Sequence, residues 1–353
     1  MGKKRDMTPK ERVMAATELR EVDRVPCLPF IREYGITYYG YTFSQMYEDY
    51  RRFVDVQVNF SKKFDLDCVW DIMMTSPEAE AMGLKQTYYE DQAPNPVQSP
   101  LENSTDLSQI KMLDPSCDAK IPLLINIVRG LKERVGNELP IVAFCQAGYR
   151  NAVFLRGINN FMLDLEDRPK WLMELIELAT EGCIIYGKAL IEAGADIILI
   201  ANPLASGSFV KRDYYEKFSL PFDKKQFDAY HEAGAKVMYH ICGWWDDRWD
   251  LIVKTGADII SLDSGYVNVD FKKAVREMGN KVSLLGQVDV VQTMLEGSVE
   301  QVKKETREAL DIGTKAKGFM LSGACVVPKD TPKENFRAFI DTWKDFNASR
   351  HGS

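Results

Sequence analysis

A short pattern of apolar and polar positions recurs four times in the second half of the chain. In each copy a helical stretch ends in glycine, an apolar run of strand length follows, and polar residues come next. The copies are EAGADIILIAN, EAGAKVMYHIC, KTGADIISLDS and EMGNKVSLLGQ, with glycines at Gly194, Gly234, Gly256 and Gly279. Each glycine predicts a left-handed residue at a helix C-terminus. The apolar runs alternate poorly with polar residues, which is typical of parallel strands buried on both faces.

Four further strands are predicted outside the repeat, over residues 25–31, 68–72, 140–144 and 318–321. With the repeat they make eight, and no linker rich in Pro, Gly or Ser divides the chain. Strands and helices that alternate in this way favour a closed (β/α)8 barrel, the TIM barrel, over an open doubly wound sheet with a second domain. We therefore predict an α/β protein in which residues 1–353 form a single TIM-barrel domain.

Two parts of the chain depart from the barrel pattern. Capping boxes at residues 8–11 and 331–334, both reading TPKE, predict a helix at each end, and the first is an N-terminal helical extension. Residues 73–115 contain several prolines and few apolar runs, so they fit poorly into any βα unit. We expect this loop excursion to cover the mouth of the barrel.

Polar residues that follow the apolar runs are the candidates for chemistry, because catalytic groups of such a barrel lie at the carboxyl ends of the strands. They are Asn202, His240, Cys242, Asp263 and Gln287, and Cys325 follows the last strand. His240 and Cys242 stand two apart, so on extended backbone both side chains project to the same side. Cys325 lies far along the chain but meets them across the mouth if the barrel closes.

A His-Cys-Cys set suits zinc, which takes imidazole and thiolate ligands in tetrahedral geometry. Three protein ligands leave one position open, and an open position is typical of a catalytic zinc site. The alternative is that His240 is a satisfied core histidine and that Cys242 and Cys325 are buried thiols. Spacing alone leaves both interpretations open.

The other candidates also have two interpretations each. Asp263 is assigned a catalytic part, as a fourth zinc ligand that leaves when substrate arrives or as a group that orients the histidine ligand; otherwise it caps a helix or ends a strand. Asn202 and Gln287 bind an anionic substrate group, or they satisfy loop backbone. Tyr149, with Arg150 beside it, reaches the substrate at the mouth, or the aromatic ring packs on top of the barrel.

Composition restricts the class of partner. The chain is 45% hydrophobic and 27% charged, with a formal net charge of −7. This balance is that of a globular protein, and the negative charge disfavours nucleic acid or an anionic membrane as partner. No apolar stretch is long enough to span a bilayer, so we expect a cytoplasmic protein. The seven cysteines indicate thiols or metal ligands before disulfides.

Longer segments across nearly the whole chain resemble one family. They are TPKERVMAAT, DRVPCLPF, SPEAEAMG, LRGINNFMLDLEDRPKWLMELI, AGADIILIANPLAS, HICGWW, LLGQVDVVQTMLEGSVEQV and LSGACVVPKDTPKEN. The chain resembles the uroporphyrinogen decarboxylase superfamily, and within it the zinc-dependent methylcobamide methyltransferases. The resemblance implies that His240, Cys242 and Cys325 are the protein ligands of Zn²⁺. It also places Asp263 where a displaceable acidic ligand would be.

The same resemblance implies an enzyme, a methyltransferase that moves a methyl group from a methylated corrinoid protein to a small-molecule thiol such as coenzyme M. A cobalt-ligating motif D-x-H-x-x-G is approached only in DAYHEAG, where Asp228 stands one residue too far from His231. We therefore expect the methylcobamide to be carried by a partner protein, the corrinoid protein, which docks at the barrel mouth. The oligomeric state is left open, with a homodimer as one option.

Three alternatives remain. A zinc methyltransferase could work in the other direction, from a methoxylated or methylated donor to the corrinoid protein, but the Glu/His-based motif of such relatives is absent. A uroporphyrinogen-type decarboxylase needs paired arginines near the amino terminus, where FIREYGITYYG offers only Arg32, and it carries Asp where this chain has Asn202. The third alternative is a non-catalytic module that binds a corrinoid protein.

Overall fold

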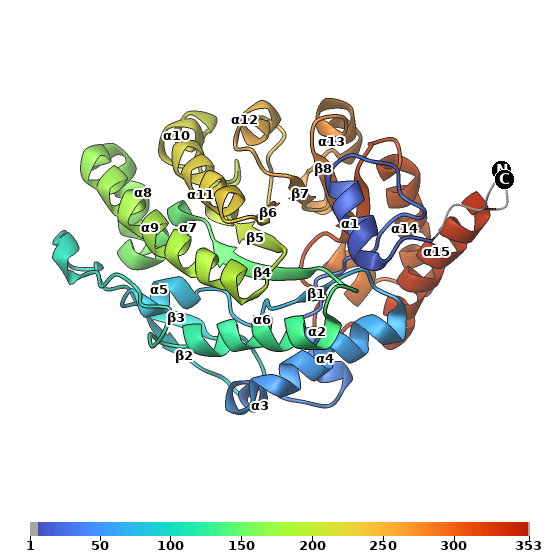
Figure 1. Cartoon of the computed structure of the whole chain (residues 1–353). Helices are drawn as coiled ribbons and strands as arrows, with labels where there is room; N and C mark the ends of the chain where they lie inside the picture. The colour runs from blue at the N-terminus through green and yellow to red at the C-terminus, as the bar shows by residue number, and fades with distance from the viewer. Residues whose placement is uncertain (1–5, 352–353) are drawn as a thin grey trace.

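The computed structural model describes residues 6–351. The predicted domain also takes in residues 1–5 and 352–353, which lie outside the described part of the chain. Seven parallel strands form one curled sheet in the order β1-β4-β5-β6-β7-β8-β9, and Figure 1 shows helices around its outer side. This arrangement confirms the predicted α/β barrel class. The strands are β1 (Val69–Trp70), β4 (Ile141–Gln146), β5 (Ile197–Ala201), β6 (Lys236–Ile241), β7 (Ile259–Leu262), β8 (Ser283–Val288) and β9 (Phe319–Gly323).

The prediction of a regular eighth strand near the amino terminus is wrong. The segment expected to form it is joined to β9 and the loop behind it by isolated parallel bridges to Leu321 and Val326. At its other edge the carbonyl of Cys27 accepts a hydrogen bond of 3.1 Å from a backbone amide just before β1. Pro26 and Pro29 have no amide to donate, so a continuous ladder cannot form there. The segment still closes the barrel, with few hydrogen bonds.

The helices follow the strands along the chain and pack outside the sheet. Before β4 they are α1 (Pro9–Thr17), α2 (Glu33–Tyr38), α3 (Phe43–Glu48), α4 (Tyr50–Phe64), α5 (Pro77–Ala81) and α6 (Ile121–Val135). After β4 they are α7 (Gly148–Arg156), α8 (Ile158–Asp167), α9 (Pro169–Ala193), α10 (Arg212–Phe218), α11 (Leu220–Glu232), α12 (Trp249–Lys254), α13 (Phe271–Met278), α14 (Val299–Gly313) and α15 (Lys333–His351). The short helical turns are η1 (Leu107–Gln109), η2 (Pro203–Ala205), η3 (Gly265–Val267) and η4 (Val290–Leu295).

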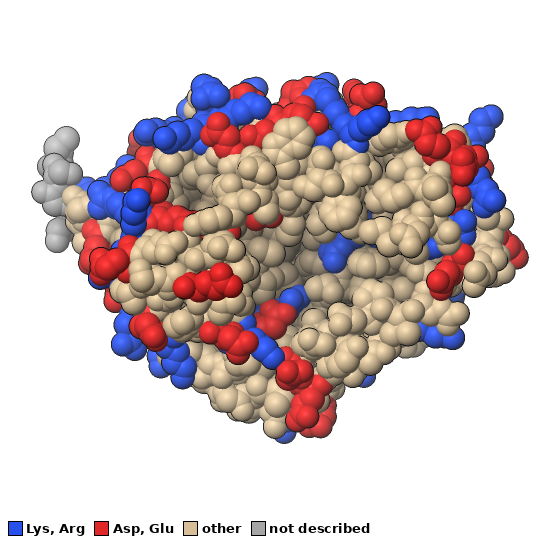
Figure 2. Space-filling view, turned by 180° about the vertical axis from the view of Figure 1, so that it is seen from behind, with Lys and Arg blue, Asp and Glu red and all other residues tan. Residues whose placement is uncertain are grey.

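One end of the barrel is closed by α1. Its first turn has the predicted capping box, in which Thr8 and Glu11 exchange hydrogen bonds with each other's backbone. Val13 and Ala16 join the apolar cluster that fills the barrel interior. The carbonyl of Ala16 lies so close to Gly318, just before β9, that a side chain there would collide with it. The strands therefore begin at the α1 end, toward the viewer in Figure 1, and the mouth is on the face seen in Figure 2.

Residues 73–115 form the predicted excursion. They contain α5, η1 and an antiparallel pair of short strands, β2 (Lys85–Thr87) and β3 (Asn95–Gln98). Residues of β3 line a pocket together with residues of α7, α8 and η2. Because α7 and η2 come directly after β4 and β5, the excursion reaches the mouth end of the barrel.

The glycines of the repeat do not all have the predicted conformation. Gly194, Gly234 and Gly256 have φ angles of +118°, +93° and +86°, as expected of left-handed residues after a helix. Gly279 has φ −61°, so the prediction is wrong there. A Cβ on Gly279 would lie 2.5 Å from the carbonyl oxygen of Val275 and 2.7 Å from Cβ of Ala316, so close packing rather than a left-handed backbone conformation requires glycine at this place.

Substitution Gly279→Ala should therefore destabilise the fold by about 1–3 kcal/mol, the usual cost of overpacking. The measurement is the midpoint of urea unfolding. Gly265→Ala is the matched control, because a Cβ at Gly265 meets no atom within 4 Å. Equal midpoints for the two variants would show that the contact with Ala316 relaxes without cost.

Candidate functional site

Three candidate ligand atoms meet at the mouth of the barrel. His240 lies near the end of β6, Cys242 follows that strand, and Cys325 lies in the loop after β9. Cys242 Sγ is 3.1 Å from His240 Nε2 and 3.8 Å from Cys325 Sγ, and Cys325 Sγ is 3.7 Å from His240 Nε2. Closure of the sheet thus brings together residues that are far apart in the sequence.

These separations fit a tetrahedral zinc site. With usual Zn–S and Zn–N bond lengths, tetrahedral angles place two sulfurs about 3.8 Å apart and a sulfur and a nitrogen about 3.6 Å apart. Two of the three observed distances, 3.8 and 3.7 Å, match these values closely, and the third is shorter at 3.1 Å. The set offers one imidazole and two thiols, which are the ligands zinc favours. The metal-binding role of the three residues stays a prediction.

The imidazole of His240 is held in one orientation. Its Nδ1 lies 2.9 Å from Ser261 Oγ on the neighbouring strand β7, which leaves Nε2 directed at the two sulfurs. The ring is 5% exposed and packs edge-on against Phe30 at 5.2 Å. Metal-binding histidines commonly use their second nitrogen in this way. Ser261 was missed in the sequence, where a serine inside an apolar run resembles any other strand residue.

Asp263 supports the loop beside the ligands. Its carboxylate accepts hydrogen bonds from the backbone amides of Gly243 at 2.8 Å and Ser264 at 2.7 Å. Burial raises the pKa of this carboxyl group above its usual range. Among the described residues, Ser261 rather than Asp263 contacts His240 Nδ1. Asp263 therefore fixes the backbone next to Cys242, and its part as a fourth ligand or catalytic residue stays a prediction.

The pKa values of the two thiols are shifted in opposite directions. A hydrogen bond from Cys242 to Cys325 lowers the pKa of Cys325 well below its usual range. The same hydrogen bond, together with burial, raises the pKa of Cys242. The pair therefore loses one proton readily, whereas loss of the second proton costs additional free energy. A nearby dication favours loss of the second proton.

The three residues predicted to contact substrate make contacts with other residues of the protein. Asn202 is fully buried, and its Nδ2 donates to Ser219 Oγ at 2.8 Å and Tyr239 Oη at 3.0 Å. Gln287 Nε2 donates to the carbonyl of Asp263 at 2.7 Å. Tyr149 is buried, with its ring 4.9 Å from that of Phe161. Their contact with substrate stays a prediction, but the amide donors of Asn202 and Gln287 already have partners.

A second group of possible ligands lies deeper in the protein. Ligand atoms of Glu78, Cys145 and Cys183 are within 4.8 Å of one another, and all three residues are fully buried. Glu78 accepts a hydrogen bond of 2.7 Å from the Gln146 amide, and Cys145 Sγ lies 3.1 Å from Tyr230 Oη. These internal hydrogen bonds are those of a structural polar cluster in the core.

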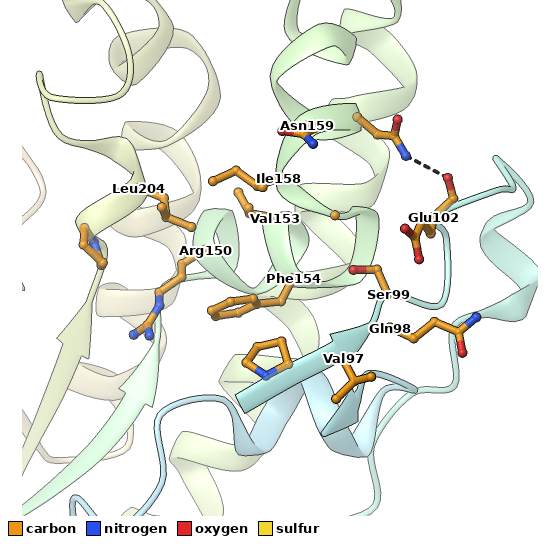
Figure 3. A pocket seen from close by; sticks show the side chains of 14 residues that line it. Val97, Gln98, Ser99, Glu102, Arg150, Val153, Phe154, Ile158, Asn159 and Leu204 are labelled. Carbon is orange, nitrogen blue, oxygen red and sulfur yellow. Dashed lines mark hydrogen bonds between the residues drawn. The ribbon is translucent and has the colours of Figure 1, made fainter. Parts of the chain in front are cut away.

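The mouth itself is hollowed. Figure 2 shows a central depression in which basic and acidic side chains are visible, surrounded largely by uncharged residues. A pocket of about 530 Å³ opens there between β3, α7, α8 and η2. Figure 3 shows Arg150 and Phe154 on α7 beside this pocket, with Arg150 next to Leu204 of η2 and its guanidinium pointing away from Ser99 and Glu102. Arg150, which lines this pocket, also interacts electrostatically with Cys242 and Cys325.

Comparison with known proteins finds relatives over nearly the whole chain. A family model described as uroporphyrinogen decarboxylase matches residues 8–346. Methylcobamide:CoM methyltransferase MtbA of Methanosarcina acetivorans is 26% identical over 97% of this chain and 99% of its own length. Methylated-thiol–coenzyme M methyltransferase of Methanosarcina mazei is 31% identical over 78% of this chain and 72% of its own length. A solved methyltransferase structure from Methanosarcina mazei superposes with a TM-score of 0.88 at 24% identity, covering 97% and 99% of the two chains.

Substitution Cys325→Ser should weaken zinc binding at least about tenfold, because even residues behind the ligands commonly contribute that much. Zinc content and affinity are measured by elemental analysis and by competition with a chromogenic chelator. Cys117→Ser, at an exposed cysteine outside the site, should keep wild-type zinc binding. Identical zinc affinity in both variants would remove Cys325 from the ligand set. Urea unfolding should be alike in the two, since a mouth ligand adds little to the barrel core.

Proposed function

We propose that this chain, which belongs to the uroporphyrinogen decarboxylase family, transfers a methyl group from a methylated corrinoid protein to a thiol. The prediction that it is a methyltransferase is confirmed. We further propose that His240, Cys242 and Cys325 hold a zinc ion that activates the thiol. The observation that carries this proposal is the set of three donor atoms, 3.1 to 3.8 Å apart, at the mouth of the barrel.

Methyl transfer to sulfur needs a thiolate, yet a free thiol with a pKa of about 8.5 is mostly protonated at neutral pH. A zinc ion bound at the site would supply the positive charge that lowers the pKa of a coordinated thiol. With the ion bound, Cys242 and Cys325 would contribute two negative charges, which balance a dication. An incoming sulfur therefore keeps high electron density. Its lone pair forms the new S–CH₃ bond, and the Co–C bond breaks with its electron pair left on cobalt.

Residues around the ligands keep the site rigid for this reaction. Ser261 fixes the imidazole through Nδ1, and Asp263 fixes the loop that carries Cys242 through the Gly243 amide. Neither residue needs to move a proton between reactants. The chemistry requires only that the thiol loses its proton on binding and that the two sulfurs of the chain stay in place.

The names of the relatives support methylcobamide as the methyl donor and a thiol as the acceptor. They describe methylcobamide as a reactant and coenzyme M as a methyl acceptor for those enzymes. The segments that follow the strands support a protein carrier for the corrinoid, because several of them expose a large apolar side chain that a docked protein would cover. They are Ile158 after β4, Phe209 after β5, Tyr266 after β7 and Val291 after β8.

We propose the cytoplasm as the location, since the seven cysteines are all free thiols, as in proteins of reducing compartments. Within residues 6–351, none of the helices has the length and apolar character that crossing a bilayer requires. We also propose that the whole chain forms one domain, because a single curled sheet runs from β1 to β9.

The test uses zinc-loaded enzyme, methylcobalamin as donor and 2-mercaptoethanesulfonate as acceptor. We expect loss of the methylcobalamin absorbance together with formation of the methyl thioether, identified by mass spectrometry. Cys325→Ser should lower turnover by about 100-fold or more, a loss typical of removing one essential polar group from a catalytic site. Cys117→Ser should retain full turnover.

Unaltered turnover in Cys325→Ser would contradict the proposed mechanism. Formation of methylcobalamin from a methylated donor, without thioether formation, would instead support transfer in the opposite direction. Removal of zinc by a chelator should abolish thioether formation, and restoring zinc should recover it.

A further inference from the structure

A buried carboxyl group that the proposed mechanism does not use lies against β6. Asp223 belongs to α11 and is fully buried. Its Oδ2 accepts hydrogen bonds from Tyr239 Oη at 2.7 Å and from Ser219 Oγ at 2.9 Å, and its Oδ1 lies 3.3 Å from Asn202 Nδ2. These donors are all uncharged. The carboxyl group is therefore stabilised by hydrogen bonds from the chain rather than by an ion pair with any of them.

The titratable groups around Asp223 come from several neighbouring elements. They are Tyr239 of β6, Tyr215 of α10 and Tyr149 of α7, and the cation Arg248, just before α12, acts on two of the same tyrosines. Burial raises the pKa of all three tyrosines, so they stay neutral. The guanidinium of Arg248 donates to two backbone carbonyls and pairs with Asp247 at 2.7 Å. Its charge is thus already balanced elsewhere.

Two partners of Asp223 also determine the position of His240. Tyr239 directly precedes His240 on β6, and successive side chains of a strand point to opposite faces of the sheet. The backbone amide of Asn202 donates a hydrogen bond of 3.1 Å to the carbonyl of His240. Contacts on the outer side of the sheet therefore hold the strand whose inner side carries the imidazole.

Trp245 connects the same group of side chains to Cys242. Its Nε1 donates to the carbonyl of Cys242 at 3.4 Å. Its buried ring packs edge-on against Tyr215, with centroids 5.3 Å apart, and lies 6.2 Å from the ring of Tyr239. The loop that carries Cys242 is therefore supported by aromatic side chains that surround Asp223.

Keeping this carboxyl group in the core costs folding free energy. A buried carboxylate without a cation is unfavourable, and burial raises the pKa of Asp223 to about 7. In an unfolded chain the pKa of Asp is about 3.9. The folded protein thus binds this proton more tightly, and the stability that protonation contributes is lost as the pH rises from about 4 through 7. Groups that are retained at such a cost are commonly functional.

We propose that Asp223 is a positioning residue for the zinc site, and that its carboxylate aligns Tyr239 and Asn202 and thereby holds His240 and Cys242 in the geometry that binds the ion. This inference rests on the proposed function, because it concerns the metal site of that same reaction.

The charge of the carboxylate is required for this alignment. An ionised carboxylate accepts all the donated hydrogen bonds at once. Protonation adds an O–H group that needs an acceptor. Asn202 Oδ1 is buried and has no partner among the described residues, but it accepts this O–H only if the amide turns over. Turning the amide removes Nδ2 from Ser219 and Tyr239, to which it donates at 2.8 and 3.0 Å.

The test is zinc affinity at pH 6 and pH 8, measured on the full chain by competition with a chromogenic chelator. At pH 8 Asp223→Asn should bind zinc about tenfold more weakly than the wild type, the loss usual for residues that support metal ligands. At pH 6, where Asp223 is mostly protonated in the wild type, the two affinities should be alike. The ratio is the readout, because protonation of the ligands weakens binding in both proteins.

The control is Asp228→Asn, on the same helix at a side chain 52% exposed, which should match the wild type at both pH values. Tyr239→Phe, which removes one donor and keeps the ring, should also weaken zinc binding at pH 8. An equal loss for Asp223→Asn at pH 6 and pH 8 would show a merely structural role and overturn the inference.

Stability provides a second readout. With a chelator present at pH 8, the urea unfolding midpoint of Asp223→Asn should be at least that of the wild type, because the variant no longer buries a charge. A lower midpoint together with weaker zinc binding would indicate general loss of structure and contradict the inference. If the zinc affinities follow the expected pattern but no thiol is methylated, the inference stands and the proposed function fails. If thiols are methylated but Asp223→Asn binds zinc like the wild type at both pH values, the inference fails and the function stands.

Discussion

The backbone contact between the amino-terminal segment and the loop after β9 holds the candidate site together. Phe30 bridges to Val326, and its carbonyl accepts a hydrogen bond of 3.1 Å from the Val327 amide, so the loop that carries Cys325 is fixed to this segment. The ring of the same Phe30 packs against His240 from β6. One residue therefore connects two ligands that come from distant parts of the chain. Because Pro29 beside it cannot donate to a ladder, this closure relies on packing as much as on hydrogen bonds.

Electrostatics divide the mouth into two unlike halves. On one side the hydrogen bond between Cys242 and Cys325 lowers the pKa of Cys325 and raises that of Cys242, so a cation nearby would favour loss of the second proton. On the other side Arg32 and Arg150 have buried N–H groups without a hydrogen-bond partner among the described residues. Buried charges and buried donors without partners both cost free energy in the folded chain. The fold supplies the free energy for this arrangement through the apolar core of the barrel, which contains none of these groups.

The repeat predicted β5 to β8 well, because buried parallel strands and helix-ending glycines leave a periodic signal in the sequence. The three candidate ligands also followed from their position after strands. Other features depend on contacts between distant residues and left no such signal. Ser261 contacts His240 only because β6 and β7 pair in that register. Gly279 has an ordinary φ angle and is required by Ala316, a neighbour that only the folded chain reveals. An apolar run containing two prolines resembled a strand but could not form a ladder.

Rigid elements fix both halves of the mouth, and this has a consequence for selectivity. His240 belongs to β6 within the closed sheet, and Arg150 to a helix that starts directly after β4. Neither can move far without disturbing the barrel. The distance between the candidate ligand atoms and Arg150 is therefore set by the fold, so under the proposed function the length of the thiol would affect how well it fits. Because the donors of Asn202 and Gln287 are already used inside the chain, few other groups can compensate for a thiol of the wrong length.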